Sequence, residues 1–140
     1  MNDKQHIKHI SYLKMASEWS SNSCCKRKKV GAIIVKDQMI ISDGYNGTPA
    51  GFNNDCEDIN GNTNWYVLHA EANAITKLAK NASGNADGST LYVTLSPCTE
   101  CSKLIIQTGI KHVIYKEEYR DLDGLKILKE SGITVSQLTY

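Results

Sequence analysis

Four residues in two short segments have the types and the spacing to carry out chemistry. His69 and Glu71 belong to a His-Ala-Glu segment, and Cys98 and Cys101 form a Cys-x-x-Cys motif directly after Pro97. Such a motif at the start of a helix is typical of two kinds of site, a redox dithiol and half of a zinc site. A thioredoxin-like motif would stand early in the chain, after a first strand, whereas this one stands late and has a candidate third ligand, His69, upstream. The pattern therefore favours zinc.

The three predicted ligands suit a zinc ion that keeps one position open. A neutral imidazole from His69 and thiolates from Cys98 and Cys101 balance the charge of Zn²⁺ and leave the fourth tetrahedral position to water. Structural zinc sites usually fill all four positions with protein ligands. The ligand set therefore indicates a catalytic site rather than a structural one.

Glu71 is a carboxylate on an apolar helix face. With Ala74, Ile75 and Leu78 it forms an i, i+3, i+4, i+7 stripe. Burying an ionised carboxylate without a partner costs several kcal/mol, so we expect Glu71 beside a proton, a metal-bound water or a cation. Together with zinc it predicts a hydrolytic site, in which the metal lowers the pKa of a water and Glu71 carries the proton to a leaving group.

Apolar periodicity predicts the elements that must position these residues. Strands that alternate with helices in the second half of the chain indicate parallel strand pairs with helices on both faces of a sheet. We therefore predict an α/β fold of three α/β/α layers, with a central mixed sheet of about five strands, in a single domain over residues 1–140. The helices are expected over 7–19, 68–80, 97–108 and 122–130, and the strands over 30–35, 39–41, 91–95, 112–115 and 133–135.

The Cys-x-x-Cys helix carries its own start signal. Ser96 is suited to cap it and Pro97 to occupy its first turn. The thiols would then lie at the positive end of the helix dipole, which favours the thiolate form that a metal requires. An i, i+3, i+4, i+7 stripe predicts that the thiol-bearing face is buried. Its members are Cys101, Leu104, Ile105 and Thr108.

Three further segments are predicted to be turns or loops. Residues 36–38 separate two β-branched runs and indicate a tight hairpin. Residues 44–51, with three glycines and one proline, specify a shaped loop. Residues 53–64, rich in Asn and acidic side chains, lack periodicity and indicate a surface excursion or a lid.

Composition narrows the class of protein. The chain has 140 residues, 41% of them hydrophobic, and a net charge of +1. This balance argues against nucleic acid as a partner, because nucleic-acid-binding domains usually carry a large positive excess. Residues 1–6 contain no apolar run long enough for a signal peptide, and no apolar run in the chain would span a bilayer. We expect a cytoplasmic protein without membrane contacts.

The chain contains five cysteines, an odd number. Without an export signal, this indicates reduced thiols and metal ligands rather than a disulfide framework. The three cysteines outside the Cys-x-x-Cys motif are Cys24, Cys25 and Cys56.

The paired motifs resemble a known signature. His69-Ala70-Glu71 followed by Pro97-Cys98-Thr99-Glu100-Cys101 is similar to the H-x-E…P-C-x-x-C pattern of zinc-dependent cytidine deaminases. A wider resemblance, from about residue 12 to residue 135, is to the deoxycytidylate (dCMP) deaminases. The glycine-rich loop distinguishes it from free-nucleoside and tRNA adenosine deaminases, which share the zinc motif. The resembling segments are 25–32, 44–51, 69–75 and 92–98.

The resemblance implies a cytidine deaminase-like fold and the zinc-dependent hydrolysis of dCMP to dUMP and ammonia, which supplies thymidylate synthesis. It implies that Asn46 holds the deoxyribose, that Arg27 binds the 5′-phosphate, and that Tyr119 and Arg120 lie near that phosphate. Guanidinium groups suit this role because they bind phosphate bidentately. Two further substrate-binding positions are implied, Ala70 and Ser96.

The resemblance also implies regulation and assembly. Family members are commonly homohexamers that dCTP activates and dTTP inhibits, and a regulatory deoxynucleoside triphosphate would bring Mg²⁺ with it. The glycine-rich loop would contribute to the regulatory site. Its residues there would be Tyr45, Gly47, Thr48 and Gly51.

Several alternatives stay open at this point. The substrate could be another cytosine compound, such as dCTP, a modified dCMP or deoxycytidine, or the chain could be a non-catalytic zinc module that senses nucleotides. The basic run 26–29 could be a solvated turn, and Asn46 could serve only the turn that Asn-Gly favours. Some relatives bind a second, structural zinc, but Val67 stands here where such a relative has a ligand.

Overall fold

A five-stranded mixed sheet forms the centre of the protein. The computed structural model describes residues 2–81 and 84–140. The strand order is β2-β1-β3-β4-β5, with β1 antiparallel to β2 and β3, and with β3, β4 and β5 parallel. The sheet confirms the predicted mixed architecture. Its strands are β1 (Gly31–Lys36), β2 (Met39–Tyr45), β3 (Thr90–Leu95), β4 (His112–Glu117) and β5 (Thr134–Gln137).

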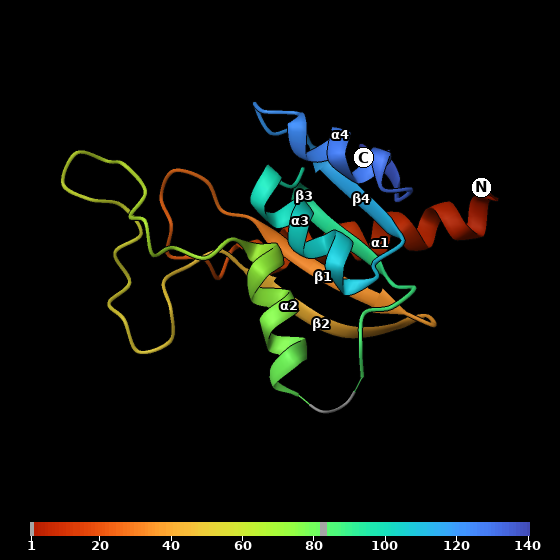
Figure 1. The fold of residues 1–140 in the computed structure, drawn as a ribbon, viewed down its shortest axis with the longest axis horizontal. Coiled ribbons are helices and arrows are strands. Elements are labelled where there is room, and N and C mark those ends of the chain that lie inside the picture. The colour runs from red at the N-terminus through yellow and green to blue at the C-terminus, as the bar shows by residue number, and fades with distance from the viewer. Residues whose placement is uncertain (1, 82–83) are drawn as a thin grey trace.

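Four helices cover the two faces of this sheet. They are α1 (Asp3–Ser20), α2 (Ala70–Lys80), α3 (Thr99–Thr108) and α4 (Asp123–Glu130). Helix α1 lies behind the sheet in Figure 1, and α2 and α3 lie in front of it. The three-layer prediction is confirmed.

The side chains of β1 explain the layers. Ile33 and Val35 pack with Leu13 and Ala16 of α1, whereas Ile34 belongs to the core on the opposite face. Successive strand residues point to opposite faces, so a strand that is apolar throughout can bury both sides. That second core continues through α2, α3 and α4.

The β1–β2 connection is the predicted tight hairpin. Lys36 pairs with Met39, and the two residues between them, Asp37 and Gln38, have φ angles of 52° and 62°. Two successive positive φ values match a two-residue turn whose twist follows that of the strands. Strand β2 continues to Tyr45, beyond the expected end at residue 41.

The start of α3 differs from the prediction. Cys98, not Ser96, is the N-cap residue, and its sulfur accepts a hydrogen bond from the backbone N–H of Cys101. Ser96 lies before the helix, and its hydroxyl accepts a hydrogen bond from the backbone N–H of Tyr119. The predicted burial of Leu104 is also wrong, because its side chain is 45% exposed. Cys101 and Ile105 are buried as predicted, and Ser102 is buried beside them.

A long irregular segment, residues 46–69, connects β2 to α2. Figure 1 shows it projecting from one end of the sheet, on the left. Two short bridges stabilise it, one between Gly47 and Leu68 and one between Glu57 and Thr63. This confirms residues 53–64 as a surface excursion.

A disulfide corrects one prediction about the cysteines. Cys25 and Cys56, expected as reduced thiols, are bonded to each other. The fold places the segment before β1 against the excursion, and sequence spacing carries no sign of that proximity. Cys24, Cys98 and Cys101 remain free. Among residues 2–81 and 84–140, no helix has the length and apolar character required to cross a bilayer.

Gly44 tests how closely β2 and α2 pack. A methyl group at this position would lie 2.5 Å from the carbonyl oxygen of Ala70 and 2.6 Å from the backbone nitrogen of Ala74. Backbone atoms cannot rotate away, so Gly44→Ala should lower the free energy of unfolding by about 1–3 kcal/mol, measured by urea denaturation. Gly47→Ala is the matched control, because the space beside Gly47 is open. Equal stability of the two variants would contradict this packing.

Candidate active site

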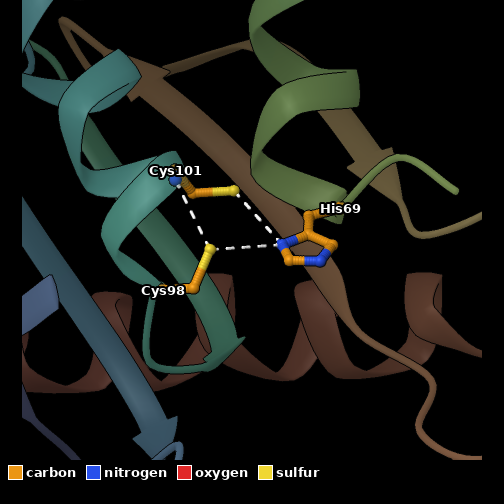
Figure 2. A group of neighbouring side chains, drawn as sticks. All are labelled: His69, Cys98 and Cys101. Carbon is orange, nitrogen blue, oxygen red and sulfur yellow. Dashed lines mark hydrogen bonds between the residues drawn. The ribbon is translucent and has the colours of Figure 1, made fainter. Parts of the chain in front are cut away.

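Three potential metal ligands converge where α2 and α3 begin. His69 Nδ1 lies 3.4 Å from the sulfur of Cys98 and 3.4 Å from the sulfur of Cys101 (Figure 2). The three ligand atoms all lie within 4.8 Å of one another. His69 is the N-cap residue of α2, Cys98 is the N-cap residue of α3, and Cys101 lies in the first turn of α3. Two helix starts therefore bring the predicted ligands together.

Packing around these helices fixes the ligands. The hydroxyl of Ser42 in β2 donates a 2.6 Å hydrogen bond to the carbonyl oxygen of Ala74. The side-chain amide of Asn73 donates a 2.8 Å hydrogen bond to the backbone carbonyl oxygen of Tyr45. Both bonds hold α2 against β2. On the other side, Gly124 of α4 approaches the backbone of Pro97 and Cys98 so closely that a Cβ atom there would clash. The loop that carries Cys98 is thus held between β3 and α4.

The donor set fits a zinc ion. Hydrogen bonds from Cys101 and from His69 together lower the pKa of the Cys98 thiol to about 4, although burial opposes the shift. The hydrogen bond to Cys98, together with burial, raises the pKa of Cys101, and the pKa of His69 is raised by its own bond to Cys98. The hydrogen bonds around Cys98 therefore favour its thiolate form, which is the form that a metal requires. One imidazole nitrogen and two sulfurs converging on one point are the ligands that zinc prefers.

Glu71 lies in the first turn of α2 and its side chain is buried, with 4% of the residue exposed. Burial raises its pKa to about 7, although a backbone hydrogen bond and the nearby His69 oppose the rise. The predicted burial of this carboxylate is confirmed. A carboxyl group with a pKa near neutrality can both accept and release a proton under ordinary conditions.

His69, Glu71 and Cys98 line a cavity of about 570 Å³, whereas Cys101 lies outside its lining. That volume lies within the range of about 300–1,000 Å³ of small-molecule sites. Three cationic side chains also line it, those of Arg27, Lys28 and Arg120. Lys28 is paired with Glu117 at 2.6 Å, whereas the guanidinium of Arg120 lies 5.6 Å from the centre of the Tyr119 ring. The cavity thus combines a potential metal site, a buried acid and a group of cationic side chains, the cationic wall, with the carboxylates of Glu57 and Glu118 beside them.

The cavity brings together most of the residues predicted from the sequence. Its lining includes Arg27, Asn46, His69, Ala70, Glu71, Ser96, Cys98, Tyr119 and Arg120. The four loop residues predicted for regulation lie outside this lining; they are Tyr45, Gly47, Thr48 and Gly51.

Asn46 uses both ends of its amide to hold the neighbouring chain. Its Oδ1 accepts a 2.9 Å hydrogen bond from the backbone N–H of Val30, and its Nδ2 donates a 2.8 Å bond to the carbonyl oxygen of Lys28. Asn46 therefore fixes residues 28–30 along the cavity wall. The sequence offered no sign of this second task.

Sequence reasoning also missed Glu57. This residue of the excursion lines the cavity, and its carboxylate accepts hydrogen bonds from the backbone N–H groups of Lys26 and Arg27. Glu57 belongs to no recognisable motif. Only the fold places it against the basic segment.

A family model for the zinc-binding region of cytidine and deoxycytidylate deaminases matches residues 6–117. The chain belongs to the cytidine and deoxycytidylate deaminase family.

Within this family, the chain is similar to several deoxycytidylate (dCMP) deaminases. The structure of a dCMP deaminase from the cyanophage S-TIM5, in complex with dCMP and dUMP, has 49% sequence identity, covers 99% of both chains and gives a TM-score of 0.92. The deoxycytidylate deaminases of Saccharomyces cerevisiae and Enterobacteria phage T4 are each 37% identical over 92% of this chain. The matched regions span 44% of the yeast protein and 89% of the phage T4 protein.

Removing one sulfur tests the metal site. Cys101→Ser should lower the zinc content from about one ion per chain to near zero after dialysis, because it removes one of only three protein ligands. The measurement is elemental analysis by inductively coupled plasma mass spectrometry. Cys24→Ser, which changes an exposed free cysteine, should keep its zinc. Full zinc content in the Cys101 variant would show that the cluster is not the metal site.

Proposed function

We propose that this protein catalyses the hydrolytic deamination of dCMP to dUMP and ammonia, a reaction that supplies dUMP for thymidylate synthesis. The observation that carries the proposal is the buried Glu71 beside the His69, Cys98 and Cys101 cluster, in a cavity with a cationic wall. The similar cyanophage enzyme, whose structure holds dCMP and dUMP, supports this choice of substrate.

His69, Cys98 and Cys101 would hold a zinc ion. When bound, zinc would supply the Lewis acidity that makes a water molecule nucleophilic near neutral pH. The exposed His69 and the half-buried Cys98 line the cavity, whereas Cys101 is buried behind them. The positive end of the α3 dipole would stabilise the thiolates. Because His69 and Cys98 line the cavity, a zinc ion that they held would act on a substrate bound there.

Glu71 moves the protons in the proposed reaction. Its carboxylate accepts a proton from the water that attacks C4 of the cytosine, and the resulting carboxyl group donates it to the ring nitrogen N3. Glu71 then accepts the second proton from the new C4 hydroxyl group and donates it to the departing amino group. A C–O bond forms, the C4–N4 bond breaks, the C4 oxygen becomes a carbonyl, and ammonia leaves. Because burial keeps the pKa of Glu71 near 7, neither protonation state is costly in this cycle.

The cationic wall would bind the 5′-phosphate. A phosphate dianion requires a fixed cation, and the guanidinium of Arg27 can bind two of its oxygens. We assign Tyr119 and Arg120 to the neighbourhood of the phosphate and Asn46 to that of the deoxyribose. Ala70, at the start of α2, and Ser96, in the loop before α3, are proposed as further substrate-binding residues.

Regulation would occur at a separate place on the glycine-rich loop. We propose that dCTP or dTTP, with Mg²⁺, binds near Tyr45, Gly47, Thr48 and Gly51 in a homohexamer. Because these residues lie outside the lining of the cavity, such a nucleotide would not compete for the substrate site.

Glu71→Gln tests the proton transfer. An amide of the same size keeps the packing but cannot take up the proton, so kcat should fall by at least about 100-fold. Zinc content, measured on the same sample, should stay at the wild-type value. Glu100→Gln is the matched control, because Glu100 is an exposed carboxylate on α3 paired with Lys103. Wild-type turnover by the Glu71 variant would refute the mechanism.

Arg27→Ala tests the phosphate assignment. The variant should raise KM for dCMP by roughly 10- to 100-fold, the effect expected for a lost charge-assisted hydrogen bond. It should leave the kinetics with deoxycytidine, which lacks the phosphate, nearly unchanged. Lys29→Ala, which removes an exposed cation outside the cavity lining, is the control. Equal effects on both substrates would remove Arg27 from the phosphate site.

A further inference from the structure

The carboxylate of Glu57 holds the backbone of the segment that carries Arg27. Its Oε2 accepts hydrogen bonds from the N–H of Lys26 at 3.1 Å and from the N–H of Arg27 at 3.3 Å, and its Oε1 accepts from Lys26 at 3.3 Å. Glu57 and Arg27 both line the cavity. The excursion thus contacts the basic segment at the residue proposed to bind phosphate.

A covalent bond lies directly beside these hydrogen bonds. Cys25 and Cys56, the residues that precede Lys26 and Glu57, form the disulfide. Residues 25–27 are therefore joined to residues 56–57 by one covalent bond and by the Glu57 carboxylate. We call this arrangement the Glu57 clasp.

The segment before β1 needs such anchors because it has no helix or strand of its own. Residues 24–30 lie between α1 and β1. Asn46 fixes one end of this segment, at residues 28 and 30, and the Glu57 clasp fixes the other end. Arg27 lies between the two anchors. Arg27 is exposed, so the position of its backbone sets the region that the guanidinium can reach.

We propose that Glu57 is a positioning residue for substrate binding, which sets the preference for a phosphorylated substrate through Arg27. The inference rests on the proposed function. The direction of the change in KM for dCMP distinguishes this role from a direct one. A carboxylate that acted on the substrate directly would repel the phosphate dianion, so its removal would lower KM. Removal of a carboxylate that acts through Arg27 would instead raise KM.

Kinetics with dCMP and deoxycytidine test this role. Glu57→Ala should raise KM for dCMP by roughly tenfold because the guanidinium is misplaced, and it should leave kcat and both constants for deoxycytidine nearly unchanged. Glu57→Gln, which keeps one acceptor oxygen, should show a smaller effect. Asp55→Asn, a change of an exposed carboxylate two residues away, is the matched control. A lower KM for dCMP, or equal losses with both substrates, would overturn the proposal.

A double-mutant cycle shows whether Glu57 acts through Arg27. In the Arg27→Ala background, Glu57→Ala should have no further effect on KM for dCMP, whereas independent residues would give multiplied effects. Multiplied effects would overturn the inference and leave the proposed function intact. A wild-type protein that prefers deoxycytidine to dCMP would contradict the proposed function, and the inference with it.

Discussion

Two helices begin at the same point of this fold, and their first residues place an imidazole, two thiols and a carboxyl group around one small space. Charged groups so close together are stable only if a cation or a proton balances them. The start of α3 favours the thiolate form of Cys98, whereas burial favours the protonated form of Glu71. The site therefore holds a negatively charged sulfur beside a carboxyl group that can carry a proton. The sheet order, the close packing of Gly44 on α2 and the contact of Gly124 with the Cys98 loop all maintain this convergence.

The remainder of the site is formed by two segments without helices or strands, and side-chain contacts hold these segments in place. The helices supply the proposed chemistry, whereas the segment before β1 and the excursion supply the cationic wall. Irregular segments lack the backbone hydrogen bonds of helices and strands, so side chains must provide their order. Asn46, Glu57 and the Cys25–Cys56 disulfide do so here. Substrate preference would therefore depend on residues that do not touch the reacting atoms.

The sequence predicts those features of the structure that follow from apolar periodicity or from a motif with fixed spacing. Apolar runs with β-branched residues predicted the strands, and the His-Ala-Glu and Cys-x-x-Cys segments predicted a cluster that the structure assembles. Contacts between distant irregular segments left no such pattern. The pairing of Cys25 with Cys56 and the bonds of Glu57 arise only once the excursion folds back. The role of Ser96 was misjudged because the helix starts later than its cap signal suggested.

The central claim is that the protein deaminates dCMP in preference to other cytosine compounds. Ultraviolet absorbance can follow deamination of dCMP, dCTP, deoxycytidine and CMP side by side, each with the zinc-loaded protein. We expect dCMP to react far faster than the other three compounds. Inert dCMP with turnover of another cytosine compound would contradict the substrate assignment, and no turnover of any of them would contradict the enzymatic role.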